Sequence, residues 1–438
     1  MIGVIADDIT GANDIGIMFS SSGYETDVYS YSPTVIEEVH NHRPNVLIFD
    51  TDSRLDKAEA AYQKVFQATK LMEKAGADQF FNKTCSVFRG NIGAEFDAML
   101  DALGEEFAIV VLGFPKNGRL TKKSVHYVHG IPLADSQFKQ DPVHPMTESN
   151  LCSILRKQTD RKVGAIHEDI IQEGGERLKS EIQKVKASGD VNYLILDVTD
   201  QDDLKEIAYA VKDEKVLCGS SALGEEIPKV KSQNHTLGED LAFPERIGQA
   251  GMLCTAGSLT PQTIDQVNYM RDKGYKTIEF DTLTFMKKDQ PSSMIDELTE
   301  EIIGDIKSGS DVIFHSSQAY QKVQQTKEEG KRQGWDGTSI SNLISERLAE
   351  VTLRVLEDTG QNRFIAAGGD TSAKICKALR VKGFRVWKEI QPGLPSCLSH
   401  KEPPYLFILK SGSFGTEDFF EQGFRHLASQ EYIKGETK

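Results

Sequence analysis

The sequence predicts an α/β protein with two domains in series, each built on a largely parallel sheet covered by helices. Three observations predict this fold class. Short apolar or β-branched runs recur along the 438 residues, amphipathic segments separate them, and the alternation stops once before it restarts. The interruption is the polar, aperiodic segment 229–246, so we expect domains at residues 1–235 and 247–438. We expect the active site in the cleft between these domains.

In the first domain, helical periodicity separates the expected strands. The helix expected after residue 90 places Ile92, Phe96 and Met99 on one face. Glu95 and Asp97 then fall on the opposite, polar face. The expected strands are residues 2–6, 45–50, 79–83, 107–114, 192–198 and 215–220.

The second domain repeats the alternation. A long helix after Thr338 is predicted by apolar residues at helical spacing, namely Ile340, Leu343, Ile344, Leu348, Val351 and Val355. The expected strands are residues 251–258, 276–280, 311–317, 363–370, 384–390 and 404–413.

Composition excludes several classes of protein. A net charge of −15 argues against a nucleic-acid or anionic-membrane surface. The longest strongly apolar run, residues 107–114, is too short to cross a bilayer, and no secretory leader is visible. The six scattered cysteines contain no CxxC pair and predict neither disulfides nor a zinc site. We therefore expect a cytoplasmic protein without nucleic-acid or membrane partners.

Charged and polar side chains follow four expected strands of the first domain. Ligands of open α/β sheets bind at the carboxyl ends of strands, and a small polyhydroxylated anion suits this mixture: Arg grips a carboxylate with two hydrogen bonds, and Asp accepts from hydroxyls. Each residue alone is equally well explained as a helix cap or a solvated charge, but four strand ends together favour a binding site. Strand alternation predicts that only one of Asp7 and Asp8 faces this site. The residues are Asp7, Asp8, Arg54, Lys83, Ser86, Arg89 and Asn91.

Glycines and hydroxyls gather at three strand-to-helix turns of the second domain. Glycine lets backbone N–H groups approach phosphate oxygens, and a helix N-terminus favours negative charge. Neither a Walker A motif nor GxGxxG is present, so a single turn could be ordinary turn chemistry, whereas three turns favour a nucleotide-phosphate site. The turns are CTAGSLTPQT with Gly257, Ser258, Thr260 and Pro261, AAGGDTSAK with Ala367, Gly368, Gly369 and Asp370, and LKSGSFG with Lys410, Gly412 and Gly415.

An anion-binding domain joined to a phosphate-binding domain indicates phosphoryl transfer. This chemistry depends on positioning and charge neutralisation, with Mg²⁺ held mainly through the phosphates and no separate protein metal site expected. The general base must be a carboxylate, and Asp7, Asp8 and Asp370 are the candidates.

Several motifs together resemble the four-carbon acid sugar kinase family, in the family's order and over nearly the full length. They are ADDITGAND, DTDSR, RGNIGAE, GIPLADSQFKQDPVHPMTES, AGGDTS, PGLPSC and LKSGSFG. The resemblance implies a sugar-acid-binding N-terminal domain and a nucleotide-binding C-terminal domain. It also implies that ATP phosphorylates the 4-hydroxyl of D-threonate, D-erythronate or a 3-oxo-tetronate.

The resemblance also implies roles for particular residues. Acid-sugar contacts fall on Asp8, Arg54 and the segment Lys83, Thr84, Cys85 and Ser86, to which the strand-end argument adds Arg89 and Asn91. ATP contacts fall on Ser258, Ala367, Gly368, Gly369, Asp370 and Gly412. We assign Asp8 to substrate contact and Asp370 to the general base, while Thr10 or Asp14 serves the first helix. Cys85 departs from the family, which commonly has Asp there, and this leaves the exact acid open.

Two other functions are compatible with parts of the pattern. A non-catalytic sensor would bind nucleotide and sugar acid without turnover. A nicotinamide-dependent oxidoreductase is disfavoured, because no GxGxxG follows a strand. The expected partners are the small sugar acid and ATP. A homodimer is the assembly considered, since the sequence does not give the oligomeric state.

Overall fold

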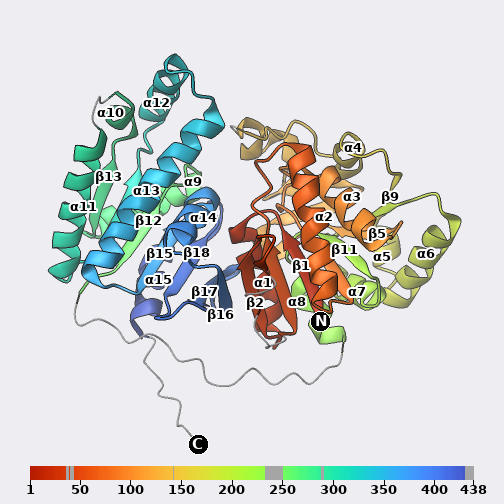
Figure 1. The fold of residues 1–438 in the computed structure, drawn as a ribbon. Coiled ribbons are helices and arrows are strands. Elements are labelled where there is room, and N and C mark those ends of the chain that lie inside the picture. Colours follow the sequence, from red (N-terminus) through yellow and green to blue (C-terminus); the bar gives the residue numbers. More distant parts are fainter. Residues whose placement is uncertain (36–38, 40–43, 142, 232–249, 288–290, 430–438) are drawn as a thin grey trace, which may run out of the picture. The chain divides into compact units, whose positions relative to one another are not determined.

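The chain folds into two compact units, Met1–Leu237 and Gly238–Lys438, each with its own strands and covering helices (Figure 1). The computed structural model describes residues 1–35, 39, 44–141, 143–231, 250–287 and 291–429. From residue 232 onward, the predicted linker 229–246 lies outside these described residues. The predicted α/β class with two domains in series is confirmed.

The first unit is built on a sheet whose neighbouring strands all run parallel. Its central strands are buried along their whole length, and most of their residues are apolar, as expected for a sheet covered on both faces. In order across the sheet, the strands are β2 (Thr26–Ser30), β3 (Val46–Asp50), β1 (Ile2–Ala6), β4 (Gln79–Lys83), β11 (Val216–Gly219), β5 (Ala108–Val111), β10 (Tyr193–Leu196) and β9 (Val163–Ile166).

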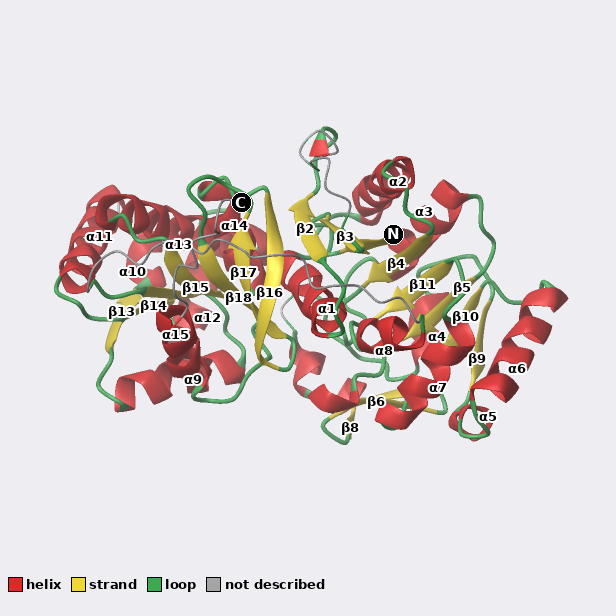
Figure 2. Ribbon diagram, turned by 90° about the horizontal axis from the view of Figure 1, so that it is seen from below, coloured by secondary structure: helices red, strands yellow, loops and turns green. Residues whose placement is uncertain are grey.

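Helices cover both faces of this sheet. In Figure 2, α2 and α3 lie on one side of β4 and β11, and α1, α7 and α8 lie on the other. The helices are α1 (Ile9–Ser21), α2 (Ala58–Lys74), α3 (Ile92–Leu103), α4 (Leu151–Arg156), α5 (Glu168–Ile171), α6 (Gly175–Ser188), α7 (Gln201–Val211) and α8 (Leu223–Val230). A small antiparallel sheet of β6 (Arg119–Lys122), β7 (Val125–Val128) and β8 (Ile131–Pro132) is added to this unit.

The strand register of the first unit brings its polar strand ends together. Ala6, at the end of β1, pairs with both Asp50 and Lys83, which end β3 and β4. Lys83 in turn pairs with Gly219, the last residue of β11. The loops that follow these four strands therefore leave the sheet at the same edge.

The second unit has a mixed sheet. Five parallel strands are continued at one edge by a pair in which β17 runs antiparallel to both of its neighbours. The order is β13 (Lys276–Phe280), β14 (Val312–Ser316), β12 (Leu253–Ala256), β15 (Arg363–Ala367), β18 (Leu406–Lys410), β17 (Leu394–Ser399) and β16 (Gly383–Gln391). Ala367, at the end of β15, pairs with both Ala256 and Lys410, so the loops after β12, β15 and β18 also share one edge.

Alternate residues of the strands face two separate cores in the second unit. Cys254 packs in a core with Val267 of α9 and Phe424 of α15, whereas its neighbour Leu253 packs on the other face with Val351 of α13. The predicted long helix is confirmed as α13. The helices are α9 (Pro261–Asp272), α10 (Thr282–Lys287), α11 (Pro291–Lys307), α12 (Tyr320–Arg332), α13 (Gly337–Thr359), α14 (Gly369–Ala378) and α15 (Phe419–Ser429).

All six cysteines are free and buried. Among the described residues, none of the helices combines the length and the apolarity needed to span a membrane.

Candidate active site

Asp7, Asp8 and Arg54 form one ion-paired cluster at the end of β1. Arg54 binds Asp7 in a bidentate manner, with Nε donating to Oδ2 at 2.8 Å and Nη2 to Oδ1 at 2.7 Å, while its Nη1 donates to Oδ2 of Asp8. Asp8 is also the N-cap of α1, because its Oδ1 accepts from the Gly11 N–H at 2.6 Å. Burial alone would raise the pKa of Asp8, but the charges of Arg54 and Lys83 and the Gly11 N–H outweigh it and lower the pKa.

The prediction that strand alternation points the Asp7 and Asp8 side chains in opposite directions is wrong. Asp7 and Asp8 both direct their carboxylates to Arg54. The alternation argument fails because β1 ends at Ala6, so Asp7 and Asp8 lie in the turn between β1 and α1, not in a pleated strand. The Arg54 guanidinium thus offsets two carboxylate charges in part. All three of its nitrogens already donate hydrogen bonds to Asp7 and Asp8.

The loop that carries Arg54 is hydrogen-bonded to side chains of α3 and of its N-cap residue. The Ser53 hydroxyl donates to Glu95 Oε1 at 2.8 Å. The Asn91 side-chain amide donates to the carbonyls of Ser53 at 3.1 Å and Asp56 at 2.9 Å. The predicted substrate residue Asn91 therefore uses its N–H groups to hold the neighbouring loop.

Glu95 does not lie on an exposed polar face, as its helical position predicted. It is 1% exposed, and burial, with the nearby charge of Asp7, raises its pKa to about 8. Burial therefore favours the protonated form of its carboxyl group. The helical pattern missed this because the loop of Ser53 covers that face of α3.

Lys83 and Asp14 lie beside the Asp7–Asp8–Arg54 cluster. The Lys83 ammonium donates to the Thr84 carbonyl at 3.1 Å and lies 3.6 Å from Asp14 Oδ2. Asp14 does not cap the helix, since Asp8 fills that position, although Thr10 does donate its hydroxyl to Asp8 at 3.0 Å. Burial raises the pKa of Asp14 to about 6.

Cys85 and Arg89 form a second pair in the same segment. Arg89 Nε lies 3.3 Å from Cys85 Sγ, its Nη1 donates to Asp141 at 2.7 Å, and its guanidinium lies over the Phe138 ring. Burial acts to raise the pKa of the Cys85 thiol, but the charges of Arg89 and Arg54 outweigh it and lower the pKa.

His126, which sequence reasoning did not select, holds the predicted residue Ser86. Its Nε2 lies 2.9 Å from the Ser86 carbonyl and its Nδ1 3.1 Å from the Thr121 hydroxyl. Burial lowers the pKa of His126 to about 3, so the neutral ring donates to the carbonyl through Nε2 and accepts at Nδ1.

In the second unit, the three glycine-rich turns are hydrogen-bonded to one another. The Gly412 carbonyl accepts from the hydroxyls of Thr260 at 2.6 Å and Thr263 at 2.9 Å. The N–H groups of Gly257 and Gly368 donate across the sheet edge to the carbonyls of Ala367 and Lys410, respectively. Thr260 and Pro261 are the N-cap and first residue of α9, as predicted.

Two of these glycines are required by close approach to Ser258. Gly368 has φ +116° and is the N-cap of α14, where a Cβ would come within 3.1 Å of the Ser258 nitrogen. A Cβ on Gly412 would lie 2.3 Å from Ser258 Oγ. Gly369 and Asp370 then open α14, and the hydroxyl of Ser341 lies 3.5 Å from Asp370 Oδ2.

A buried lysine lies beneath these turns. Lys410, which is not exposed, donates to Thr263 Oγ1 at 3.0 Å and to the carbonyls of Ser411 and Gly412, both at 2.9 Å. Burial lowers its pKa to about 7. A lysine of this kind gains a proton easily when an anion approaches.

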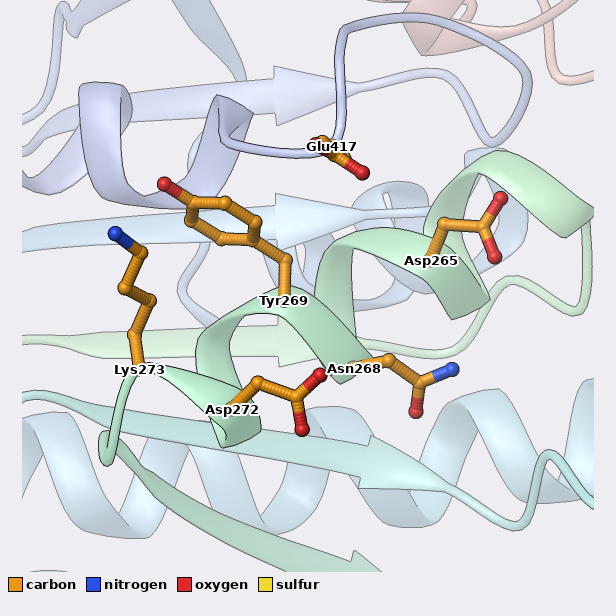
Figure 3. A pocket seen from close by; sticks show the side chains of 6 residues that line it. All are labelled: Asp265, Asn268, Tyr269, Asp272, Lys273 and Glu417. Atoms are coloured by element: carbon orange, nitrogen blue, oxygen red, sulfur yellow. The ribbon is translucent and has the colours of Figure 1, made fainter.

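A separate hollow of about 270 Å³ lies along α9 of the second unit (Figure 3). Asp265, Asn268, Tyr269, Asp272 and Lys273 come from α9 and its C-cap, and Glu417 reaches toward them from the loop after β18. Three carboxylates against one lysine disfavour a phosphate group, so this hollow does not suit the phosphates of a nucleotide.

The structure brings most predicted residues into two groups, one per unit. Within the described ranges, it contains no group of three or more His, Cys, Asp or Glu side chains arranged to hold a metal ion. Sequence reasoning assigned Asp14 only to the first helix and missed Glu95, His126 and Ser221, whose hydroxyl donates to Asp14. Ser221 lies two residues after the end of β11, and this strand-end position was the available signal.

Comparison with known families assigns the two halves separately. The family described as "Sugar-binding N-terminal domain" matches residues 2–227. The family described as "Nucleotide-binding C-terminal domain" matches residues 253–420.

Curated relatives match over nearly the whole chain. A 3-oxo-tetronate kinase of Brucella melitensis is 29% identical, with 98% of this chain and 96% of that protein covered. The 3-oxo-tetronate kinase of Haemophilus influenzae is 30% identical over 96% of this chain and 98% of that protein. The 3-oxo-tetronate kinase of Pseudomonas fluorescens is also 30% identical, over 98% of this chain and 97% of that protein.

Two crystal structures share the fold along the full length. A Salmonella typhimurium LT2 protein, provisionally described as a tRNA synthase, superimposes with a TM-score of 0.78 at 25% identity and covers 99% of both chains. A Haemophilus influenzae protein superimposes with a TM-score of 0.70 at 28% identity, over 96% of this chain and 98% of that chain.

Proposed function

Because the chain belongs to the four-carbon acid sugar kinase family and is a carbohydrate-acid kinase, we propose that it transfers the γ-phosphate of ATP to the 4-hydroxyl of a four-carbon acid sugar. Among such acids, a 3-oxo-tetronate is the first choice, because the relatives compared are kinases of that acid. D-Threonate and D-erythronate are the other acids to test.

The observation that carries the proposal is the chemical contrast between the two strand-end groups. One group offers carboxylates and cations, which suit an acid with several hydroxyls. The other offers glycine turns and the start of α14, which suit phosphates. We accordingly assign the acid to residues 1–235 and the nucleotide to residues 247–438.

Within this proposal, each group has a role. Asp8, Lys83 and the segment through Ser86 bind the acid, with Arg54 orienting the Asp8 carboxylate through its own hydrogen bond. Ser258, residues 367–370 and Gly412 surround the phosphates. Asp370 accepts the proton of the attacking hydroxyl, as a carboxylate within hydrogen-bond reach of that oxygen would.

Mg²⁺ fits the second group, because Asp370 lies half-buried in the first turn of α14, where a carboxylate oxygen suits a hard cation. When bound, mainly through the phosphates, it neutralises their charge. We place the enzyme in the cytoplasm, where its six buried cysteines remain thiols.

The test is ADP release during incubation with ATP, Mg²⁺ and a panel of four-carbon acids that includes both epimers of each. We expect ADP release and a 4-phosphorylated product with one member of the panel, and the position of the phosphate is read by NMR. A sensor would bind nucleotide and acid without ADP release, and an oxidoreductase would instead consume a nicotinamide cofactor. Either of these outcomes would overturn the proposal.

A further inference from the structure

A buried lysine of the first unit is held by residues from two other chain segments. Lys83 ends β4 and is 3% exposed, Asp14 lies in α1 and is 3% exposed, and Ser221 follows β11 and is not exposed. Ionised groups are seldom buried this deeply unless they are paired. The three side chains belong to segments that are far apart in sequence and that meet at one sheet edge.

The contacts form a short chain that ends on the Lys83 ammonium. The Ser221 hydroxyl donates to Asp14 Oδ2 at 2.5 Å, and the same oxygen lies 3.6 Å from Lys83 Nζ. The backbone of α1 leaves room for this arrangement, since a Cβ on Gly11 would come 3.1 Å from Lys83 Nζ and 2.6 Å from Asp8 Oδ1. A larger residue at position 11 would therefore press on the Asp8 carboxylate and crowd the Lys83 ammonium.

Asp14 has no other evident structural task. It is not the cap of α1, and its second oxygen, Oδ1, is shielded from solvent and makes no hydrogen bond with any described residue. Removing a carboxylate from water is costly, and here a lysine and one hydroxyl offset that cost. The arrangement is best explained by what Asp14 does for Lys83.

Lys83 is a cation of this cluster with donor capacity to spare. Arg54 already uses three of its five N–H groups on Asp7 and Asp8. An ammonium has three N–H groups, and Lys83 has one hydrogen bond, to the Thr84 carbonyl, together with its ion pair to Asp14. A third N–H group is left for a ligand.

We propose that Asp14 and Ser221 are positioning residues that hold the Lys83 ammonium where it binds the carboxylate or a hydroxyl of the acid substrate. This inference rests on the proposed function, because it deepens the role of the acid site. Ser221 fixes the Asp14 carboxylate, and Asp14 fixes the charge and direction of Lys83. Neither Asp14 nor Ser221 needs to touch the acid.

The first test removes only the hydroxyl. Ser221→Ala is expected to raise KM for the acid about tenfold, with kcat within about twofold and KM for ATP unchanged, because one hydrogen bond to a buried carboxylate is lost. Ser221→Thr keeps a hydroxyl and is expected to restore KM toward the wild-type value. The matched control is Thr199→Val, which removes a hydroxyl that donates to another buried carboxylate, Asp203, at 2.6 Å and should leave KM for the acid unchanged.

The second test uses pH. The charged groups that act on Asp14 are Lys83 from β4, Asp8 at the start of α1 and Arg119 from β6. Because burial raises the pKa of Asp14 to about 6, kcat/KM for the acid should fall as the pH is lowered through that value and Asp14 is protonated. Asp14→Asn should have a low kcat/KM for the acid that no longer changes with pH near 6.

Calorimetric titration of the acid into the same variants separates this inference from the proposed function. Weaker acid binding by Ser221→Ala and Asp14→Asn, with unchanged ADP binding, supports it whether or not turnover is seen. Unchanged acid affinity in both variants, or an Asp14→Asn profile that keeps the inflection near pH 6, overturns it while leaving the kinase assignment intact. A wild-type protein that neither phosphorylates nor binds any acid of the panel overturns both.

Discussion

At the ends of β1, β3 and β4 the polar groups are mainly charged side chains, whereas at the ends of β12, β15 and β18 they are mainly hydroxyls and backbone groups around glycines, with Lys410 buried beneath them. Both sets lie at the carboxyl edge of parallel strands. The first set is held by ion pairs, such as Arg54 with Asp7. The second is held by hydrogen bonds to main-chain carbonyls, such as that of Gly412.

The difference teaches which substitutions each region tolerates. A site made of charged side chains is sensitive to the shape and charge of each side chain. Its backbone conformation, however, is one that many residue types can adopt. A site made of backbone turns is sensitive to an added Cβ and to any change in φ. The comparison predicts opposite sensitivities for the two units, and four experiments can break or sharpen it.

The largest effect is expected from Asp370→Asn, the one charged side chain proposed to act within the backbone-lined region. Loss of the general base should lower kcat about 10²- to 10⁴-fold with near-normal acid binding. Steady-state kinetics and calorimetry with the acid measure the two quantities. Asp336→Asn is the control, since Asp336 is exposed and caps the nearby helix α13. If Asp8→Asn abolished kcat and Asp370→Asn weakened only acid binding, the base would belong to the first unit.

Arg54→Lys tests the charged region. Lysine keeps the charge but loses the planar fork that binds Asp7 through two nitrogens and Asp8 through the third. We expect kcat/KM for the acid to fall roughly tenfold to a hundredfold, with ATP affinity unchanged.

The matched control for Arg54→Lys is Arg161→Lys, because Arg161 also pairs with two aspartates, Asp97 and Asp101, within the same unit. Comparable losses in both variants would show that the effect is general destabilisation. A loss of ATP affinity in Arg54→Lys alone would assign Arg54 to the nucleotide.

Gly368→Ala tests the backbone-lined region. A left-handed φ of +116° costs an alanine about 1–3 kcal/mol, and the new Cβ would press on the Ser258 nitrogen. We expect ADP affinity to fall about tenfold in calorimetry, with acid binding unchanged. Gly274→Ala is matched, because Gly274 has φ +85° and no atom within 4 Å of its Cβ position. Equal loss of ADP affinity in both variants would contradict a local effect.

The smallest effect on catalysis is expected from Glu95→Gln, which acts on stability instead. Burial raises the Glu95 pKa from 4.5 to about 8, so the folded state holds a proton that the unfolded state releases. The stabilisation is fully present below the unfolded pKa and is lost as pH rises through the folded pKa. Glutamine stays neutral, so the variant should be more stable than the wild type at about pH 9 and similar at about pH 4.

Denaturant unfolding across this pH range measures the effect. Glu105→Gln, which removes a partly exposed acid paired with Lys215, is the control and should retain the wild-type slope. If the unfolding free energy of Glu95→Gln changed with pH as steeply as that of the wild type, Glu95 would be ionised in the folded protein.

The fold class was predictable because buried parallel strands have continuous apolar sequences. Strands that lack such a run were missed. β2 reads TDVYS, β9 is the four-residue VGAI, and β17 contains a proline. In the first unit the missed strands β2 and β9 are the two edges of the sheet, whereas in the second unit the missed strand β17 lies between β18 and β16.

The candidate site was predictable only as a set of positions. The strand-end rule selected Asp8, Arg54 and Lys83, and the structure brings them together. The rule did not reveal that the Arg54 guanidinium hydrogen-bonds to two aspartates. These aspartates are 46 and 47 residues away in the sequence, so tertiary packing decides that they meet Arg54. The burial of Glu95 was missed for the same reason, since a loop covers a helix face that reads as polar.

The hydrogen bonds between the three turns of the second unit also affect how the protein is made. Gly257, Gly368 and Gly412 are brought together across strands that are distant in sequence. On the ribosome, the hydrogen bonds between these turns therefore cannot form until the chain has been synthesised past Gly412, whereas every side chain of the cluster around Asp8, Arg54 and Lys83 has been made by Ser221. The first unit can complete this cluster while the second is still being translated. A nucleotide that binds only the assembled turns would then act as a stabiliser of the finished chain.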